Sequence, residues 1–156
     1  MSNFITPEVE LKLMFEKVMV TARGHSNITA RHRTTLEITR ETWLTPRGDC
    51  IVGVDASMGL ADFPERFRRL ACRDDAVITL RLRAGDECFV VRGRGSRYLT
   101  FSDGMSMVVR RSSYTCGRTL MIRASAAARD VPRRMVRLLR NPEQVLIAEV
   151  SVQLQK

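Results

Sequence analysis

The sequence predicts an α+β fold, with two amphipathic helices packed on a mostly antiparallel sheet. Apolar residues recur at helical spacing in two segments, 60–71 and 128–139, and alternate with polar residues in the segments between them. When the chain is shifted against itself by 68 residues, the two halves align without a gap, so that Ala56-Ser57 falls on Ala124-Ser125. We therefore expect two pseudo-repeats, each with the order strand, strand, strand, helix, strand.

Both expected helices begin with the same local signal. An aspartate stands two residues before a proline, at Asp62 and at Asp130, as suits an N-cap near the first turn. The apolar positions follow at i, i+3, i+7, i+10 and i+11, which places them on one face of each helix. They are Leu60, Phe63, Phe67, Leu70 and Ala71 in the first helix, and Ala128, Val131, Met135, Leu138 and Leu139 in the second.

The other periodic segments predict strands. Residues 77–84 alternate cleanly between apolar and polar positions, as a strand with one buried face does. The same pattern predicts strands at 16–23, 29–40, 51–56, 87–92, 97–101, 105–111, 120–124 and 145–152, with a hairpin turn at 93–96. Residues 84–86 would link repeats of about 14–84 and 86–154, which are too small to fold alone, so we expect one domain over 1–156.

Composition and charge limit the classes of protein. The chain is 44% hydrophobic and has no apolar run of about 18 residues, so no membrane span is expected. Residues 1–13 lack the apolar core of a signal peptide, which predicts a cytoplasmic protein. Of the 26 basic residues 23 are arginine, and the net charge is +9. This charge indicates either a polyanionic partner or a solubility trait, and composition does not choose between them.

The cysteines point to no metal site. Cys50, Cys72, Cys88 and Cys116 stand singly, and without a C-x-x-C pair neither a zinc ribbon nor a thioredoxin-type centre is expected. Cytoplasmic thiols are usually unpaired, and the sequence does not choose among the three disulfide pairings. It also identifies no cofactor.

One polar block, residues 23–50, holds both histidines and most of the groups that suit a functional site. An imidazole or a carboxylate there can move a proton, which makes catalytic candidates of His25, His32, Glu37 and Asp49. Guanidinium and amide groups can hold an anion, which makes anion-binding candidates of Arg23, Asn27, Arg33 and Arg47. On a strand over 29–40, His32 would lie on the apolar face and be structural, whereas His25 would lie in an exposed turn.

The polar faces of the two expected helices are rich in arginine. Such a face is ordinarily only solvated, but on neighbouring helices it could form a phosphate-binding surface. The residues concerned are Arg66, Arg69, Arg73, Arg133, Arg137 and Arg140. Few aromatic residues stand among them, which favours contacts with the backbone of RNA over stacking on its bases.

The polar block also resembles a known family. Arg23-Gly24-His25, Asn27, the run 32–37 and the run 44–51 are similar to the archaeal domain-of-unknown-function family numbered 371. The resemblance covers nearly the whole chain. It implies an archaeal cytoplasmic protein with an α+β fold, and it implies no activity.

Three functions therefore stay open. The first is binding of RNA or another polyanion through arginine surfaces, which a flat arginine face with buried histidines would favour. The second is a small-molecule enzyme with a histidine base, a carboxylate partner and arginines that hold a phosphate or carboxylate, which a pocket lined by both histidines and Glu37 would favour. The third is a non-catalytic structural or assembly protein, which internal pairing of Arg33, Glu37 and Asp49 would favour. The oligomeric state is open in all three.

Overall fold

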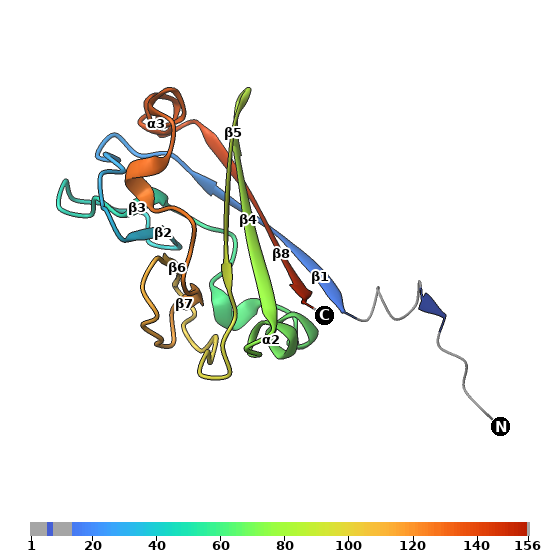
Figure 1. The fold of residues 1–156 in the computed structure, drawn as a ribbon. Coiled ribbons are helices and arrows are strands. Elements are labelled where there is room, and N and C mark those ends of the chain that lie inside the picture. Colours follow the sequence, from blue (N-terminus) through green and yellow to red (C-terminus); the bar gives the residue numbers. More distant parts are fainter. Residues whose placement is uncertain (1–5, 8–13, 156) are drawn as a thin grey trace.

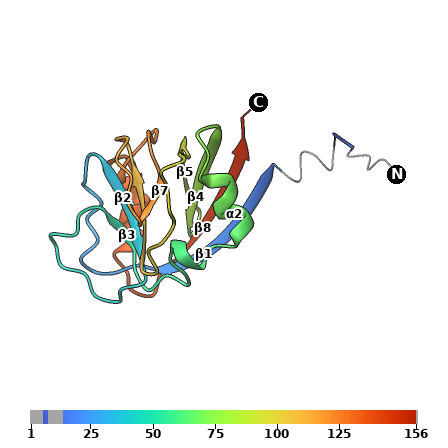
Figure 2. The same cartoon turned by 90° about the horizontal axis from the view of Figure 1, so that it is seen from below.

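The chain folds into two four-stranded sheets, and a computed structural model describes residues 6–7 and 14–155 of it (Figures 1 and 2). The long sheet is wholly antiparallel and has the order β1-β8-β4-β5. In the short sheet, ordered β3-β2-β6-β7, only the central pair is antiparallel and the two outer pairs are parallel. The bounds are β1 Phe15–Arg23, β2 Thr35–Thr39, β3 Ile51–Gly53, β4 Ala76–Ala84, β5 Glu87–Arg94, β6 Ser106–Arg110, β7 Thr119–Met121 and β8 Val145–Leu154.

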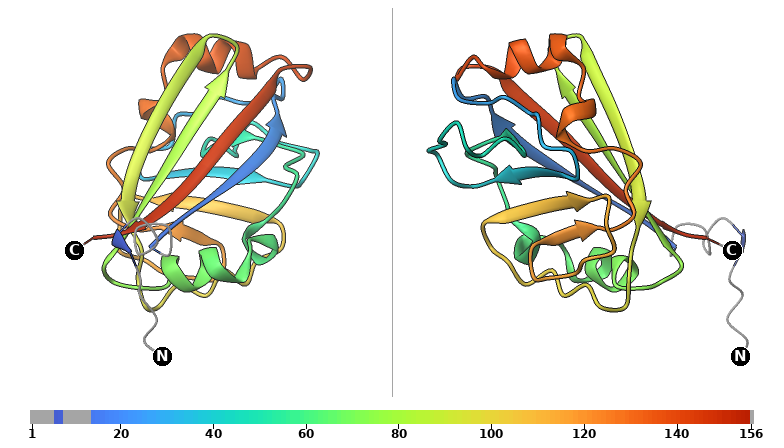
Figure 3. Two further views of the ribbon diagram at one scale, coloured as in Figure 1. Left: turned by 90° about the vertical axis from the view of Figure 1, so that its right-hand side faces the viewer. Right: turned by 60° about the vertical axis from the view of Figure 1, so that its left-hand side comes forward.

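Within residues 14–155, two short helical segments accompany the sheets. The first consists of a 3-10 turn, η1 (Leu60–Asp62), and the helix α2 (Glu65–Ala71), and the second of η2 (Ala128–Asp130) and α3 (Arg133–Leu139). Figures 1 and 3 show α2 and α3 at opposite ends of the molecule. Within the described ranges, no helix is long and apolar enough to cross a membrane.

The predicted helix starts are wrong in one respect. Asp62 and Asp130 do not cap the α-helices but end the 3-10 turns, and their carboxylates accept the backbone N–H groups of Gly59 and Ala127, each at 2.9 Å. The α-helices begin one residue after the proline, which is the N-cap: the carbonyl oxygens of Pro64 and Pro132 accept the N–H groups of Arg68 and Val136, each at 3.1 Å. The Asp-x-Pro signal therefore marks the 3-10 turn.

The core lies between the two sheets and against the helices. Alternate residues of the long sheet, such as Val20, Leu80 and Val150, are fully buried, and so are Leu36 and Ile38 of the short sheet. Near α2 the buried rings Phe63, Phe67 and Phe101 form a cluster with centroids 5.1–6.1 Å apart, in which Phe63 meets each of the other two edge-to-face. The α+β architecture predicted from the sequence is confirmed, with two sheets where one was expected.

Two predicted strands are wrong. Residues 97–101 form no strand, because β5 continues to Arg94 and the chain then turns so that the Ser96 N–H donates to the carbonyl oxygen of Ala71 (3.3 Å). Likewise β2 begins only at Thr35, and residues 28–34 form a loop in which Ala30 has a φ of 50°. In both places contacts with a distant segment replace the ladder that alternation alone predicts.

The two halves contain the same elements in the same order, and several contacts recur. The Arg23 N–H to Val54 C=O bond of 2.8 Å has a counterpart of 2.8 Å between Arg94 and Ile122. The Ser57 hydroxyl accepts the Thr21 N–H (3.0 Å), as the Ser125 hydroxyl accepts the Arg92 N–H (3.1 Å). That the halves arose by internal duplication stays a prediction.

Candidate functional site

The polar block extends over the β1–β2 loop, the strand β2 and the β2–β3 loop, and the first of these loops is packed against the end of α3. Backbone N–H groups of Gly24 and His25 donate to the carbonyl oxygens of Gln144 (2.9 Å) and Leu139 (2.8 Å). A side chain on Gly24 would overlap the carbonyl oxygens of Leu139 and Asn141. Glycine is therefore required here for close approach of two backbones.

Arg133 of α3 fixes the next part of the loop. Its guanidinium donates to the carbonyl oxygens of Thr29 (3.0 Å) and Ala30 (2.7 Å), beside the left-handed backbone of Ala30. The backbone N–H of Arg129 in η2 donates to the carbonyl oxygen of His32 (3.0 Å). Segments about a hundred residues apart in the sequence thus hold one another through backbone groups.

This packing gathers four arginines around a shallow hollow of about 380 Å³, which we call the arginine pocket. Its lining consists of Ala30, Arg31, Arg33, Arg129 and Arg133. Within residues 6–7 and 14–155, no carboxylate oxygen lies within 4.0 Å of a nitrogen of these arginines. Burial and the neighbouring charge of Arg31 lower the pKa of Arg133. The pocket therefore concentrates positive charge that the described residues leave unneutralised.

The two histidines stabilise turns. Nδ1 of His32 accepts the backbone N–H groups of Thr34 (3.2 Å) and Thr35 (3.1 Å), and Nδ1 of His25 accepts the N–H of Asn27 (3.0 Å). These acceptor roles assign the proton of each neutral ring to Nε2. Both side chains are half-buried. The predicted positions, on an apolar strand face for His32 and in an exposed turn for His25, are both wrong, because the strand is shorter and the loop packs inward.

Glu37 lies on the outer face of the short sheet, in a second polar cluster. One carboxylate oxygen accepts the hydroxyl of Ser106 (3.2 Å), and the Cys50 thiol donates to the other (3.9 Å). Burial raises the pKa of Glu37, against the opposing effect of Arg118 and Arg110. Burial and the charge of Glu37 raise the pKa of the Cys50 thiol to about 11. This thiol is therefore protonated at neutral pH, which makes it a poor nucleophile.

The remaining candidates of the polar block are dispersed. Asp49 contributes its carbonyl oxygen, which accepts the N–H groups of Arg31 (2.9 Å) and His32 (3.2 Å). The Asn27 amide donates to the carbonyl oxygen of Leu44 (2.7 Å), and Arg23 lies 3.8 Å from Asp55. Arg47 is exposed in the loop between β2 and β3. Of the predicted anion-binding residues, only Arg33 lines the arginine pocket.

The arginines that were predicted to form one surface on the two helices fall into two separate groups. Three of them form ion pairs around α2: Arg66 with Glu16 at 2.8 Å, Arg69 with Glu65 at 3.0 Å, and Arg73 with Asp75 at 2.8 Å. On α3, Arg137 and Arg140 are exposed, and Arg133 lines the arginine pocket. Because α2 and α3 lie at opposite ends of the molecule, their arginines do not form one surface (Figure 3).

Sequence reasoning missed Arg31 and Arg129 as site residues. Both are visible as arginines in the expected strand and helix, but only the docking of the loop on η2 brings them together. Among the residues that the structure describes, no group of three or more His, Cys, Asp or Glu side chains is placed to hold a metal ion. All four cysteines are free thiols.

Comparison with known proteins finds relatives without an assigned activity. The sequence model of a family described as domain of unknown function (DUF371) matches residues 20–153. An uncharacterized protein, MJ0206, of Methanocaldococcus jannaschii is 38% identical over 128 residues, which cover 82% of this chain and 94% of that protein.

Proposed function

The chain belongs to the family of domain of unknown function DUF371, and we propose that it binds RNA by holding backbone phosphates in the arginine pocket. The observation that carries the proposal is the convergence of four arginines with no carboxylate of the described residues in contact. A phosphate placed there would neutralise charge that now repels itself.

The chemistry of the pocket fits phosphate oxygens. A guanidinium presents a rigid fork of N–H donors that matches two oxygens of one phosphate. Arg133 already donates to backbone carbonyls, so it would contribute its positive charge and hold the loop in place. The exposed Arg31, Arg33 and Arg129 would donate the hydrogen bonds to the phosphate oxygens. The loop is held in place by backbone hydrogen bonds, so little ordering is needed when an anion binds.

The partner is a polymer rather than a single phosphate because the hollow is shallow and the protein carries a net charge of +9. A polyanion releases counterions at every neutralised phosphate, and this supplies affinity without a deep cavity. The lining contains no aromatic side chain on which a base could stack. The pocket would therefore position the RNA backbone without reading its sequence. An RNA partner agrees with the expected cytoplasmic location.

The test is fluorescence anisotropy of a labelled RNA with wild-type protein and with Arg31→Ala, Arg33→Ala and Arg129→Ala. We expect each substitution to weaken binding about 5- to 20-fold, as loss of a charge-assisted contact does. The control is Arg97→Ala, which removes the same charge from an exposed residue that pairs with Asp74 at 2.8 Å. Equal affinity of all four variants would refute a specific role for the pocket, and absence of binding at low salt would refute RNA binding altogether.

A small-molecule enzyme is the second candidate, and the cluster around Glu37 favours it. His32 accepts the hydroxyl of Thr35 (3.0 Å), and the Cys50 thiol donates to Glu37 (3.9 Å). Thr35 and Glu37 lie on the same face of β2, so these contacts bring a histidine and a carboxylate of the predicted set to one side of the short sheet. Calorimetric titration with inorganic phosphate separates the candidates, because saturable millimolar or tighter binding that RNA does not displace would favour a small ligand.

A further inference from the structure

The outer face of the long sheet is left uncovered. Residues alternate along its strands, so that Val18, Val20 and Ala22 of β1 point into the core while their neighbours point outward. Figure 3 shows the four strands in full view on this side, with α2 and α3 beyond the two ends. No described helix or strand crosses the face, and it lies on the side of the core away from the short sheet (Figure 2).

This face carries an excess of positive charge. The strand pairing places six outward cations on it, which are Lys17, Arg23, Arg81, Arg83, Arg92 and Arg94, and Arg23 lies 3.8 Å from Asp55 beyond the strands. Against these, the outward positions of the four strands contribute one carboxylate, Glu149, which lies 3.2 Å from Lys17 and 3.9 Å from Arg81. Arg83 and Arg92 make no ion pair with any described carboxylate.

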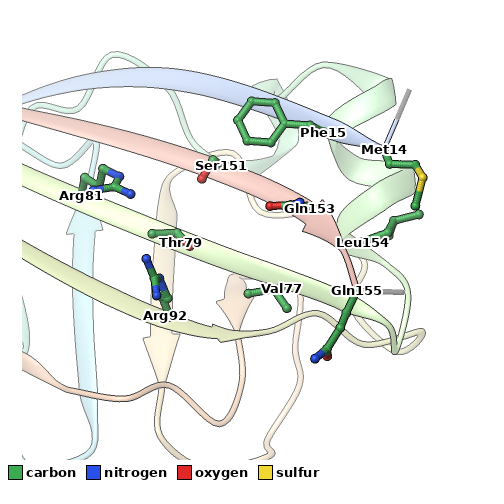
Figure 4. Close-up of a pocket in the computed structure, with 10 residues that line it drawn as sticks. All are labelled: Met14, Phe15, Val77, Thr79, Arg81, Arg92, Ser151, Gln153, Leu154 and Gln155. Carbon is green, nitrogen blue, oxygen red and sulfur yellow. The ribbon is translucent and has the colours of Figure 1, made fainter. Parts of the chain in front are cut away.

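A hollow of about 630 Å³ occupies one end of the face (Figure 4). Phe15 lies at its rim with 42% of its surface exposed. Hydroxyl and amide groups of Thr79, Ser151 and Gln153 line its floor, and the Arg92 guanidinium lies across from Phe15. Thr79 is paired with Ser151 of β8 on one side and with Arg92 of β5 on the other, so these three residues form one row across three strands.

We propose that this face binds a single-stranded segment of RNA. The inference rests on the proposed function for the class of partner, but it concerns a surface separate from the arginine pocket. An aromatic ring and guanidinium planes accept stacked bases, hydroxyl and amide groups bond base edges, and the cations follow the phosphates. A second copy of the chain would place these cations against one another, so charge favours the polyanion.

The face selects single strands because stacking needs bases that are not already paired. A duplex presents its phosphates but hides the faces of its bases, so it would contact the cations and leave Phe15 unused. The strand β1 spans nine residues, or roughly 30 Å at about 3.3 Å per residue, which suits a short run of nucleotides. Binding of a single strand should therefore depend on Phe15, and binding of a duplex should not.

The experiment measures anisotropy of a labelled uridine oligomer of about 12 nucleotides, and of a blunt RNA duplex with a similar number of phosphates. The variants are Phe15→Ala, Arg92→Ala, and Phe15→Trp, which keeps a stacking surface. We expect Phe15→Ala to weaken single-strand binding about tenfold and duplex binding less than twofold, and Phe15→Trp to restore wild-type affinity. Arg97→Ala is the control for Arg92→Ala, because it removes the same charge from another exposed site. The melting temperature of each variant shows whether it folds.

The outcomes separate the two proposals. If Phe15→Ala and Arg92→Ala bind like wild type while Arg33→Ala does not, the sheet surface is refuted and the arginine pocket stands. If the wild type binds neither RNA, both proposals fail. If light scattering shows a dimer that Phe15→Ala dissociates, the face is an interface between copies and the inference is refuted.

Discussion

Individual polar side chains in the site have two different tasks. Arg133 and Asn27 donate to backbone carbonyls, and His32 accepts backbone N–H groups, so these three side chains fix the conformation of the loop. Arg31 and Arg33 are exposed and are not ion-paired with any described carboxylate. Substitutions should separate the two groups, because the first kind changes stability and the second changes affinity.

His32 provides the test of a shaping role. In His32→Ala the N–H groups of Thr34 and Thr35 lose their acceptor, so we expect a loss of about 1–2 kcal/mol in the free energy of unfolding. His32→Asn should recover part of that loss, because asparagine accepts an N–H two residues later in the chain. Urea denaturation followed by circular dichroism measures both. A His32→Ala protein as stable as wild type would show that the bonds contribute nothing.

Glu37 should make stability depend on pH. Burial raises the pKa of Glu37 in the folded protein, so the ionised carboxylate lowers the free energy of unfolding. Below the ordinary pKa of 4.5 the group is protonated in both the folded and the unfolded protein, and this loss is absent. Stability that Glu37 provides in its protonated form is therefore lost as pH rises from about 4.5 through the folded-state pKa.

Glu37→Gln removes this charge and keeps an acceptor for Ser106. We expect the melting temperature of the variant, relative to wild type, to be higher at pH 7 than at pH 4. Scanning calorimetry at the two pH values measures the difference. A relative melting temperature that falls with rising pH would mean that the folded protein stabilises the charged carboxylate instead.

At the scale of elements, two glycines let loops approach the ends of helices. A side chain on Gly95 would overlap the carbonyl oxygen of Ala71 behind α2, as one on Gly24 would overlap Leu139 behind α3. We expect Gly24→Ala and Gly95→Ala each to cost about 2 kcal/mol or more. The matched control is Gly104→Ala, because nothing lies within 4 Å of a side chain there. Equal stability of the three variants, measured by urea denaturation, would contradict this packing.

The sequence predicts elements well where one periodicity extends over many residues. The alternation in 77–84 and in 145–152 correctly places β4 and β8, and the apolar spacing around Phe67 correctly gives the buried face of α2. On α3 the spacing correctly gives Met135 and Leu139, but Val136 is buried where Leu138 was expected. It fails at 28–34 and 97–101, where a residue with positive φ and bonds to a distant helix override alternation. Local pattern contains no information about such partners.

The site is less predictable than the fold for the same reason. The sequence identifies the polar block and the arginines of the second helix separately, and Arg33 and Arg133 are in the predicted sets. Which residues of the two groups meet depends on how η2 and α3 dock on the β1–β2 loop. Arg31 and Arg129 become site residues only through that docking.

At the scale of the whole molecule, the fold sets where positive charge is left unpaired. Around α2, carboxylates pair with Arg66, Arg69 and Arg73. No described carboxylate pairs with the arginines of the arginine pocket, or with Arg83 and Arg92 on the outer face of the long sheet. These two surfaces lie on different sides of the core, so one RNA could contact either without blocking the other. The unpaired arginines of these two surfaces contribute part of the net charge of +9.

The most direct test of this account is the salt dependence of RNA affinity for wild type and for the combined variant Arg31→Ala, Arg33→Ala, Arg129→Ala. Each lost phosphate contact should reduce the slope of log affinity against log salt by about 0.7 for a single strand, so the combined variant should lose about two units of slope. Arg97→Ala should keep the wild-type slope. A combined variant with the slope and affinity of Arg97→Ala would show that the arginine pocket does not hold phosphates.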